Sequence, residues 1–251
     1  MLTPKQIDTF VDNLKNAYSI ASHLITEDSI RHFFIEALVA NGISINDIAI
    51  EVPYVVNPSK KGKGKKSSTP ISIIYKTWFN SERNRADIYC YSITGAHSDF
   101  NRKANKNHDI IIEVKYHRAT PYSDSCKTSK AGEAFNDLNR LSMIDADNKY
   151  FVYVFDCEMY NSYNGGKTHY ASDIFKKTFA VGSRKTIDSN YPVCPTAMSV
   201  KDFKKNAFHT FKDLYSNFSH FNYAVESIYN DIIVEDKLWC IILKVNANKR
   251  P

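Results

Sequence analysis

The chain has 251 residues, of which 43% are hydrophobic and 24% are charged, and its formal net charge at pH 7 is +6. This length and composition suit one large globular domain with a sizeable core. The positive charge permits a polyanionic partner. The five cysteines lie far apart and form no C-x-x-C pair, which argues against a disulfide framework and against a zinc site.

The same features bear on the compartment. The first residues lack the apolar core of a secretory signal peptide, and no apolar run reaches the length of a transmembrane helix. Unpaired cysteines favour a reducing environment. We therefore predict a cytoplasmic protein with no membrane partner.

Two amphipathic helices are predicted at the start of the chain. Apolar residues recur at helical spacing over residues 4–24 and again over 28–40, where Asn41 and Gly42 are typical of a helix end. The second helix has an apolar stripe, made of Ile30, Phe33, Phe34, Ala37 and Leu38. Glu36 lies at the border of that stripe, where it is either a solvated residue or part of a site.

The next elements are strands. Residues 48–56 are strand-like, but Pro53 removes a ladder donor and predicts an edge or bent strand. The lysine-rich stretch 57–70 is either a loop that follows phosphates or a solvated hairpin tip. Residues 71–79 form another predicted strand, and the turn 80–84 makes it a hairpin with the strand that follows.

That following strand covers residues 85–93, with Arg85, Asp87 and Tyr89 on one face. A polar, basic loop over 94–107 is short enough to return the chain as an antiparallel neighbour, over 108–116. Asp87 can then lie across from Glu113.

The strand over 108–116 presents charge at the end of an apolar run. Ile110, Ile112 and Val114 form its core face, while Glu113 and Lys115 share the other. Burying such charges is costly unless they are paired or bound to a metal. Two carboxylates also repel unless a cation or a proton lies between them, and Mg²⁺ suits oxygen ligands. The alternative is an exposed ion pair of little consequence.

A helix is predicted over residues 131–144 and a buried central strand over 150–156. Strand, helix and strand at this spacing indicate a parallel crossover. Beyond residue 157 the patterns are weaker. The basic stretch 172–190 has no clear pattern, residues 200–218 are typical of an amphipathic helix, and residues 238–245 of a strand.

At these residues the chain resembles the PD-(D/E)XK nuclease superfamily. The matching segments are Arg85-Ala86-Asp87-Ile88 as the Asp strand and Glu113-Val114-Lys115 as the E-x-K strand; Ala86 stands where the family name has Pro. The resemblance covers about residues 24–156 and implies an α/β, restriction-endonuclease-like fold. Its central mixed sheet has an antiparallel meander and a parallel crossover strand, flanked by helices. Residues 1–251 are then one nuclease domain, and residues 157–251 add α+β elements for substrate recognition.

The resemblance also implies a function, a Mg²⁺-dependent endonuclease on double-stranded DNA, similar to type II restriction enzymes. Asp87 and Glu113 would be metal ligands, Lys115 would assist the attacking water, and Glu36 would be the acidic residue of the preceding helix. Mn²⁺ would substitute for Mg²⁺. A homodimer is expected because a duplex has two strands, and a cognate methyltransferase is a further expected partner.

Candidate DNA contacts are the basic side chains of the loops and the histidine beyond the E-x-K motif: Lys61, Lys63, Lys65, Arg102, Lys103, His117 and Lys130. Two alternatives stay open on the same scaffold, a repair or recombination nuclease and a non-catalytic nucleic-acid-binding protein. A plain interaction domain whose basic loops bind nothing is a third.

Overall fold

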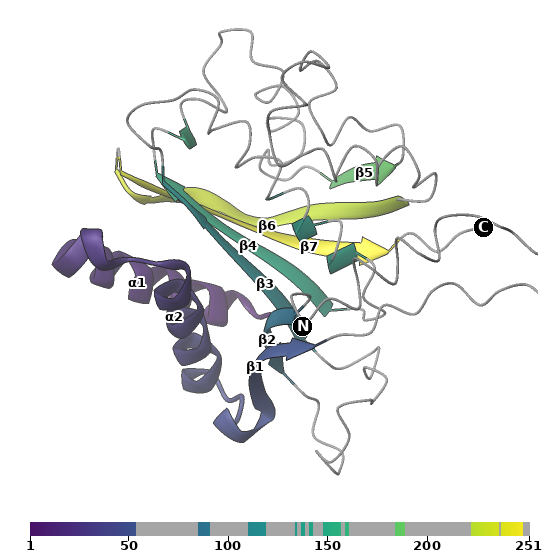
Figure 1. The fold of residues 1–251 in the computed structure, drawn as a ribbon, viewed down its shortest axis with the longest axis horizontal. Coiled ribbons are helices and arrows are strands. Elements are labelled where there is room, and N and C mark those ends of the chain that lie inside the picture. Colours follow the sequence, from purple (N-terminus) through teal and green to yellow (C-terminus); the bar gives the residue numbers. More distant parts are fainter. Residues whose placement is uncertain are drawn as a thin grey trace, which may run out of the picture.

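The structure is a computed structural model, shown in Figure 1. It describes most of the chain's regular elements, in residues 1–53, 85–90, 110–118, 148–156, 159–160, 184–188, 222–235 and 237–247. It also describes five helical residues between β3 and β4, namely Ala134, Asp137, Leu138, Leu141 and Ser142. The predicted strand 71–79, the predicted helix 200–218 and the basic loops 57–70 and 94–107 lie outside the described residues.

Both predicted N-terminal helices are confirmed. Helix α1 spans Pro4–Ala21 and α2 spans Glu27–Ala40. The side chain of Thr3 caps α1 and that of Thr26 caps α2, each accepting a hydrogen bond from the backbone N–H three residues on. Short 3-10 helices follow, η1 at Ser22–Leu24 and η2 at Ile45–Asp47. Gly42 ends α2 with a φ of +96°, a conformation that favours glycine.

The strands form one mixed sheet of seven, in the order β1-β2-β3-β4-β7-β6-β5. Their bounds are β1 Ile48–Pro53, β2 Arg85–Cys90, β3 Ile110–His117, β4 Asn148–Asp156, β5 Arg184–Asp188, β6 Asn222–Val234 and β7 Leu238–Ala247. Only the β3–β4 pair is parallel among these; the other neighbours are antiparallel. The predicted α/β class with a mixed sheet is thus confirmed.

Strand β6 was not predicted, because Glu226, Asn230 and Asp231 interrupt its apolar pattern. It forms nonetheless as the antiparallel neighbour of β7. The two strands, with β5, extend the sheet beyond β4 (Figure 1). The described strands after residue 157 therefore continue the same sheet as the predicted core.

One hydrophobic core cluster lies between the sheet and the two helices, which cover one face of it (Figure 1). The strands contribute every second residue to it, and the helices contribute the residues of one face. Among these residues are Phe10, Leu14, Phe34, Leu38, Ile112, Val114, Val152 and Ile242. Strand β4 is buried at every position from Asn148 to Phe155, as its continuous apolar run predicted. No described helix is both long enough and apolar enough to cross a membrane.

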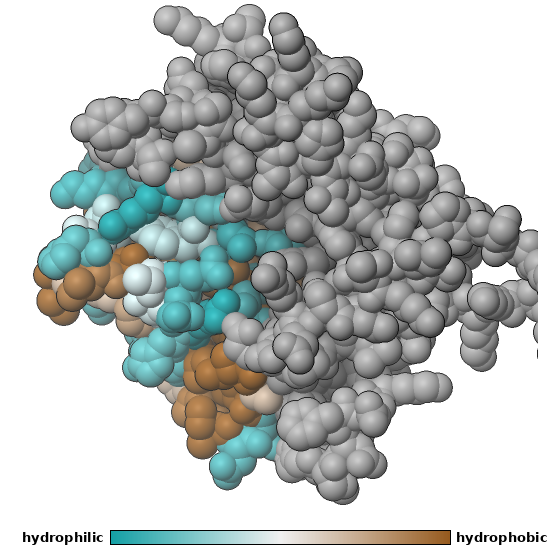
Figure 2. Space-filling model, in the orientation of Figure 1, coloured by the Kyte–Doolittle hydropathy of each residue, from teal (hydrophilic) through white to brown (hydrophobic). Residues whose placement is uncertain are grey.

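On the face shown in Figure 2 the described surface is largely hydrophilic. Hydrophobic residues gather near the end of α2 and the start of β1. This part of the chain includes Ile45, which is 59% exposed, and Ile50, which is 54% exposed. Such residues are common singly on protein surfaces, so they do not by themselves mark a binding site.

The packing of α1 on α2 generates a first prediction. Phe10 and Phe34 are fully buried, and their ring centroids lie 4.6 Å apart. Phe10→Ala should lower the free energy of unfolding by about 3–5 kcal/mol, because it removes buried apolar surface and leaves a cavity. Urea denaturation followed by circular dichroism measures this. The control Ile20→Ala, at a position 85% exposed, should change stability by no more than about 0.5 kcal/mol.

Candidate functional site

The candidate site lies where the sheet opens between β2 and β3. These strands pair only at Ile88↔Ile112, Tyr89↔Ile111 and Cys90↔Ile110. Strand β2 continues to pair with β1 as far as Arg85, so it leaves β3 and stays with β1. The next register position after the last pair belongs to Asp87 and Glu113. Both side chains are buried, with residue exposures of 5% and 6%.

Where β3 no longer pairs with β2, carboxylate side chains accept the hydrogen bonds of its backbone N–H groups. The backbone N–H of Val114 donates to Asp87 Oδ2 at 2.6 Å, and that of Tyr116 donates to Glu27 Oε2 at 3.2 Å. Residues two apart on a strand direct their N–H groups to the same side. The amides that β2 would have satisfied are therefore satisfied by side chains, one from β2 and one from α2.

Arg31 joins the first turn of α2 to β2. Its Nη2 atom lies 2.5 Å from Asp87 Oδ1 and 3.3 Å from Glu27 Oε1. Its Nη1 atom lies 3.0 Å from Asp28 Oδ1. The side chain of Arg31 is only 16% exposed. The guanidinium thus holds the carboxylates of two elements that are far apart in sequence.

Lys115 is held by two carboxylates. Its Nζ atom lies 2.9 Å from Asp137 Oδ2 and 3.7 Å from Glu27 Oε2. Burial lowers the pKa of the Lys115 ammonium, but the charges of Asp137, Glu27 and Glu113 and the hydrogen bond to Asp137 together raise it by more, so its pKa is raised overall. Lys115 therefore stays a cation over the whole ordinary pH range.

Negative charge exceeds positive charge at this site. The carboxyl groups are those of Glu27, Asp87, Glu113 and Asp137, and the cations are those of Arg31 and Lys115. Burial raises the pKa of Asp87 from its ordinary value of 3.8 to about 7. The Val114 N–H and Arg31 oppose this shift, while Glu27 and Asp137 add to it. Asp87 therefore exchanges a proton near neutral pH.

We call the opening between β2 and β3, with the charged side chains around it, the fork. Its donors suit a divalent cation of the Mg²⁺ type. They are carboxylate oxygens, and their charge is not fully balanced by Arg31 and Lys115. The described residues contain no group of three or more His, Cys, Asp or Glu side chains arranged around one metal position. Mg²⁺ does not require such a group, because it usually binds one or two carboxylates and completes its shell with water and substrate phosphate. Asp87 and Glu113 fit that requirement.

Glu36 lies away from these residues. It is exposed on α2, and its Oε1 atom lies 3.1 Å from His32 Nε2. The acidic residue that α2 supplies to the fork is Glu27. Nine residues separate the two, which corresponds to about 900° of rotation and so to opposite sides of the helix. The spacing along the helix could have identified Glu27. It precedes the buried Ile30 by three positions and the buried Phe34 by seven, which places it on the same side of α2 as they are.

Asp137 belongs to the predicted helix over residues 131–144, and its exposure is only 3%. It lies three residues after Ala134 and four before Leu141, both buried, so its spacing already placed it on the buried stripe. The spacing of Arg31 is equally informative. It lies four residues after Glu27 and three before the buried Phe34, so it shares their side of α2.

The expected DNA contacts are mostly outside the described residues: Lys61, Lys63, Lys65, Arg102, Lys103 and Lys130. His117 is described and lies inside the protein, with 6% exposure. Its Nδ1 atom is 2.9 Å from the Tyr153 hydroxyl, and the two rings meet edge to face. The burial of His117 does not suit the exposed phosphate contact that we expected of it.

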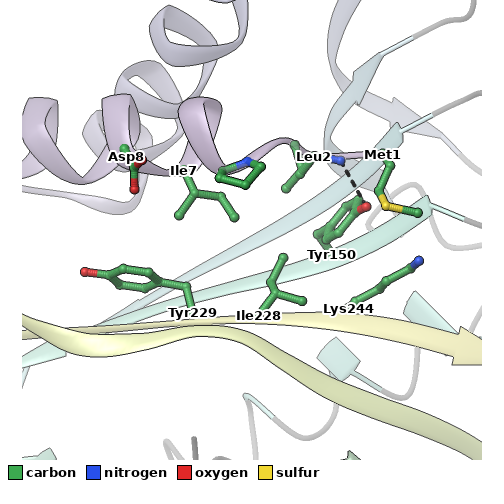
Figure 3. A pocket seen from close by; sticks show the side chains of 9 residues that line it. Met1, Leu2, Ile7, Asp8, Tyr150, Ile228, Tyr229 and Lys244 are labelled. Carbon is green, nitrogen blue, oxygen red and sulfur yellow. Dashed lines mark hydrogen bonds between the residues drawn. The ribbon is translucent and has the colours of Figure 1, made fainter. Parts of the chain in front are cut away.

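A pocket of about 230 Å³ lies elsewhere, between the start of α1 and the part of the sheet formed by β4, β6 and β7 (Figure 3). Its walls are mainly apolar, with Leu2, Ile7 and Ile228 among them. The backbone N–H of Leu2 donates to the Tyr150 hydroxyl at 3.1 Å. Asp8 is the only carboxylate in its lining, so the pocket lacks the paired carboxylates of the fork.

Comparisons of the chain with known protein families, with curated proteins and with solved structures give no match.

The raised pKa of Asp87 generates a prediction. Between about pH 4 and pH 7 the folded protein holds a proton on Asp87 that the unfolded chain releases. In metal-free buffer this group should therefore lower the free energy of unfolding as pH rises through that window, by at most about 4 kcal/mol, with a plateau above.

Asp87→Asn cannot titrate and should lack this component. Urea denaturation of both proteins at several pH values gives the difference. Parallel pH profiles for the two proteins would contradict the assignment.

Proposed function

We propose that this protein is a Mg²⁺-dependent endonuclease of the PD-(D/E)XK superfamily that hydrolyses phosphodiester bonds in double-stranded DNA, in the manner of type II restriction enzymes. The observation that carries the proposal is the position of Asp87 and of the E-x-K residues Glu113 and Lys115. All three lie where β2 leaves β3, in a buried site with excess negative charge.

The sheet supports the same proposal. Strands β1, β2 and β3 are antiparallel neighbours, and β4 lies parallel to β3 after a helical segment. A helix pair precedes them and packs on the sheet. This is the element order that the resemblance to the restriction-endonuclease-like fold implies.

In the proposed reaction Asp87 and Glu113 would hold the metal, and Glu27 would lie beside them. Bound Mg²⁺ would neutralise charge on the phosphate and lower the pKa of a coordinated water. Lys115 remains protonated, so its role is that of a fixed positive charge that orients water or stabilises negative charge developing on the phosphate. It is not the base that accepts the proton of the attacking water.

Arg31 has a part in the metal-free protein. It pairs with the Asp87 carboxylate, whose pKa is raised chiefly by burial and further by the charges of Glu27 and Asp137. A nearby cation stabilises the ionised form of a carboxyl group, so Arg31 keeps Asp87 closer to the state that binds a metal.

A non-catalytic nucleic-acid-binding protein is the second candidate. It is favoured by the ion pairs at the fork, since Asp87 and Asp137 already have cationic partners. It would bind DNA in a salt-dependent manner without metal-dependent cleavage. A repair or recombination nuclease of the same superfamily would differ in substrate, so trials with nicked, branched and single-stranded DNA separate it from a restriction-like enzyme.

A homodimer and a cognate methyltransferase belong to the restriction-like form of the proposal. The homodimer would present one site to each strand of the duplex.

Plasmid cleavage with Mg²⁺ or Mn²⁺ tests the proposal. Glu113→Gln and Lys115→Met should each lower the cleavage rate by about 100-fold or more, because the first removes a proposed metal ligand and the second removes a positive charge that stabilises the transition state. Asp12→Asn removes an exposed carboxylate of α1 and should cleave like wild type. If both fork variants retain the wild-type rate, the assignment is wrong.

A second pair of variants tests which acidic residue of α2 serves the site. Glu27→Gln should lower the cleavage rate by about 10- to 100-fold, because Glu27 contacts Lys115 and the Tyr116 amide at the fork. Glu36→Gln, on the far side of the same helix, should leave the rate unchanged. A loss in Glu36→Gln with none in Glu27→Gln would reverse the assignment.

A further inference from the structure

Asp137 is the buried carboxylate closest to Lys115. It belongs to the helical segment that connects β3 to the parallel strand β4, and its Oδ2 atom lies 2.9 Å from Lys115 Nζ. We propose that Asp137 is a positioning residue, which fixes the Lys115 ammonium at the fork and acts on the reaction only through it. The inference rests on the proposed nuclease function and names a residue that the E-x-K motif does not include.

The stability of the fold does not by itself explain why residue 137 is a carboxylate. The described neighbours on the same segment, Ala134, Leu138 and Leu141, are 0–1% exposed, so an apolar side chain would suit it. A buried ion pair is often no better for stability than a well-packed apolar pair of the same volume. The charge of Asp137 therefore calls for another explanation.

The position of the lysine supplies one. A lysine side chain has four rotatable bonds and loses conformational entropy when it is held in one place. Lys115 is held from two sides, by Asp137 at 2.9 Å and by Glu27 at 3.7 Å. Glu27 also accepts the Tyr116 N–H and pairs with Arg31, so its position serves several groups. Asp137 makes the shorter contact.

The segment that carries Asp137 is itself anchored to the sheet. Lys149, at the start of β4, is fully buried, and its Nζ atom donates to the carbonyl oxygen of Ser142 at 2.9 Å. This bond joins the far end of the helical segment to the strand beside β3. A rigid support of this kind is what a precisely placed side chain needs. The parallel crossover thus carries Asp137 to the end of β3.

A double-mutant cycle tests the inference. The variants are Asp137→Asn, Lys115→Met and the combination, assayed by single-turnover cleavage at saturating DNA with Mg²⁺. Asp137→Asn should lower the rate by about 10- to 100-fold with DNA affinity unchanged. In the Lys115→Met background the same substitution should change the rate by no more than about twofold, because Asp137 then has no ammonium to position.

Manganese binding supplies a readout that does not depend on activity. By isothermal titration calorimetry, at a pH where Asp87 is ionised in both proteins, Asp137→Asn should bind Mn²⁺ as wild type does, because Asp137 contacts Lys115 and is not a proposed metal ligand. Asp12→Asn is the matched control for loss of one carboxylate. If Asp137→Asn does not fold, Asp137→Glu keeps the charge and shifts it by one methylene, and its cleavage rate should fall, again only when Lys115 is present.

The outcomes are separable. Multiplicative effects of the two single substitutions, a wild-type rate for Asp137→Asn, or weakened Mn²⁺ binding in Asp137→Asn would each overturn the positioning role while wild-type cleavage upheld the proposed function. Wild-type protein that cleaves no form of DNA would overturn the proposed function, and the inference with it.

Discussion

The hydrogen bond from the Val114 N–H to the Asp87 carboxylate is the contact on which the site depends. Where β2 leaves β3, the next backbone amides of β3 would be buried without a partner, which is costly. Carboxylate side chains satisfy them instead. These bonds hold the carboxylates against the strand that carries Glu113 and Lys115. The need to satisfy the backbone N–H groups of β3 therefore also brings the acidic side chains together.

The fork holds charged side chains next to the hydrophobic core, where burial of charge is unfavourable. Four carboxyl groups and two cations lie close together beside strands whose other positions are apolar. Burial opposes ionisation of Asp87, and Lys115 stays charged because the surrounding carboxylates Asp137, Glu27 and Glu113 together outweigh the desolvation of its ammonium. Sites of this kind are where proteins tolerate unfavourable burial for the sake of chemistry.

The site is supported from several directions. Helix α2 supplies Glu27 and Arg31 from its first two turns, and β2 and β3 supply the residues that flank the opening. The crossover segment supplies Asp137. The apolar alternate positions of β3 and β4 pack beneath α1 and α2, so the same strands hold the core on one face and the charges at one end. Strand β7, from the end of the chain, pairs along β4 and completes the centre of the sheet.

The local pattern of the chain determined a good part of this protein. Helical spacing and cap residues predicted α1 and α2, and β-branched runs with period-two alternation predicted β2, β3, β4 and β7, because these signals depend on near neighbours. The register that sets Asp87 beside Glu113 followed from a short return between two strands. The tertiary structure alone decided the rest. Which side of α2 faces the fork selects Glu27 over Glu36, the crossover brings Asp137 to Lys115, and pairing with β7 makes a strand of the polar sequence in β6. Each depends on contacts between residues far apart in the chain, which local periodicity does not encode.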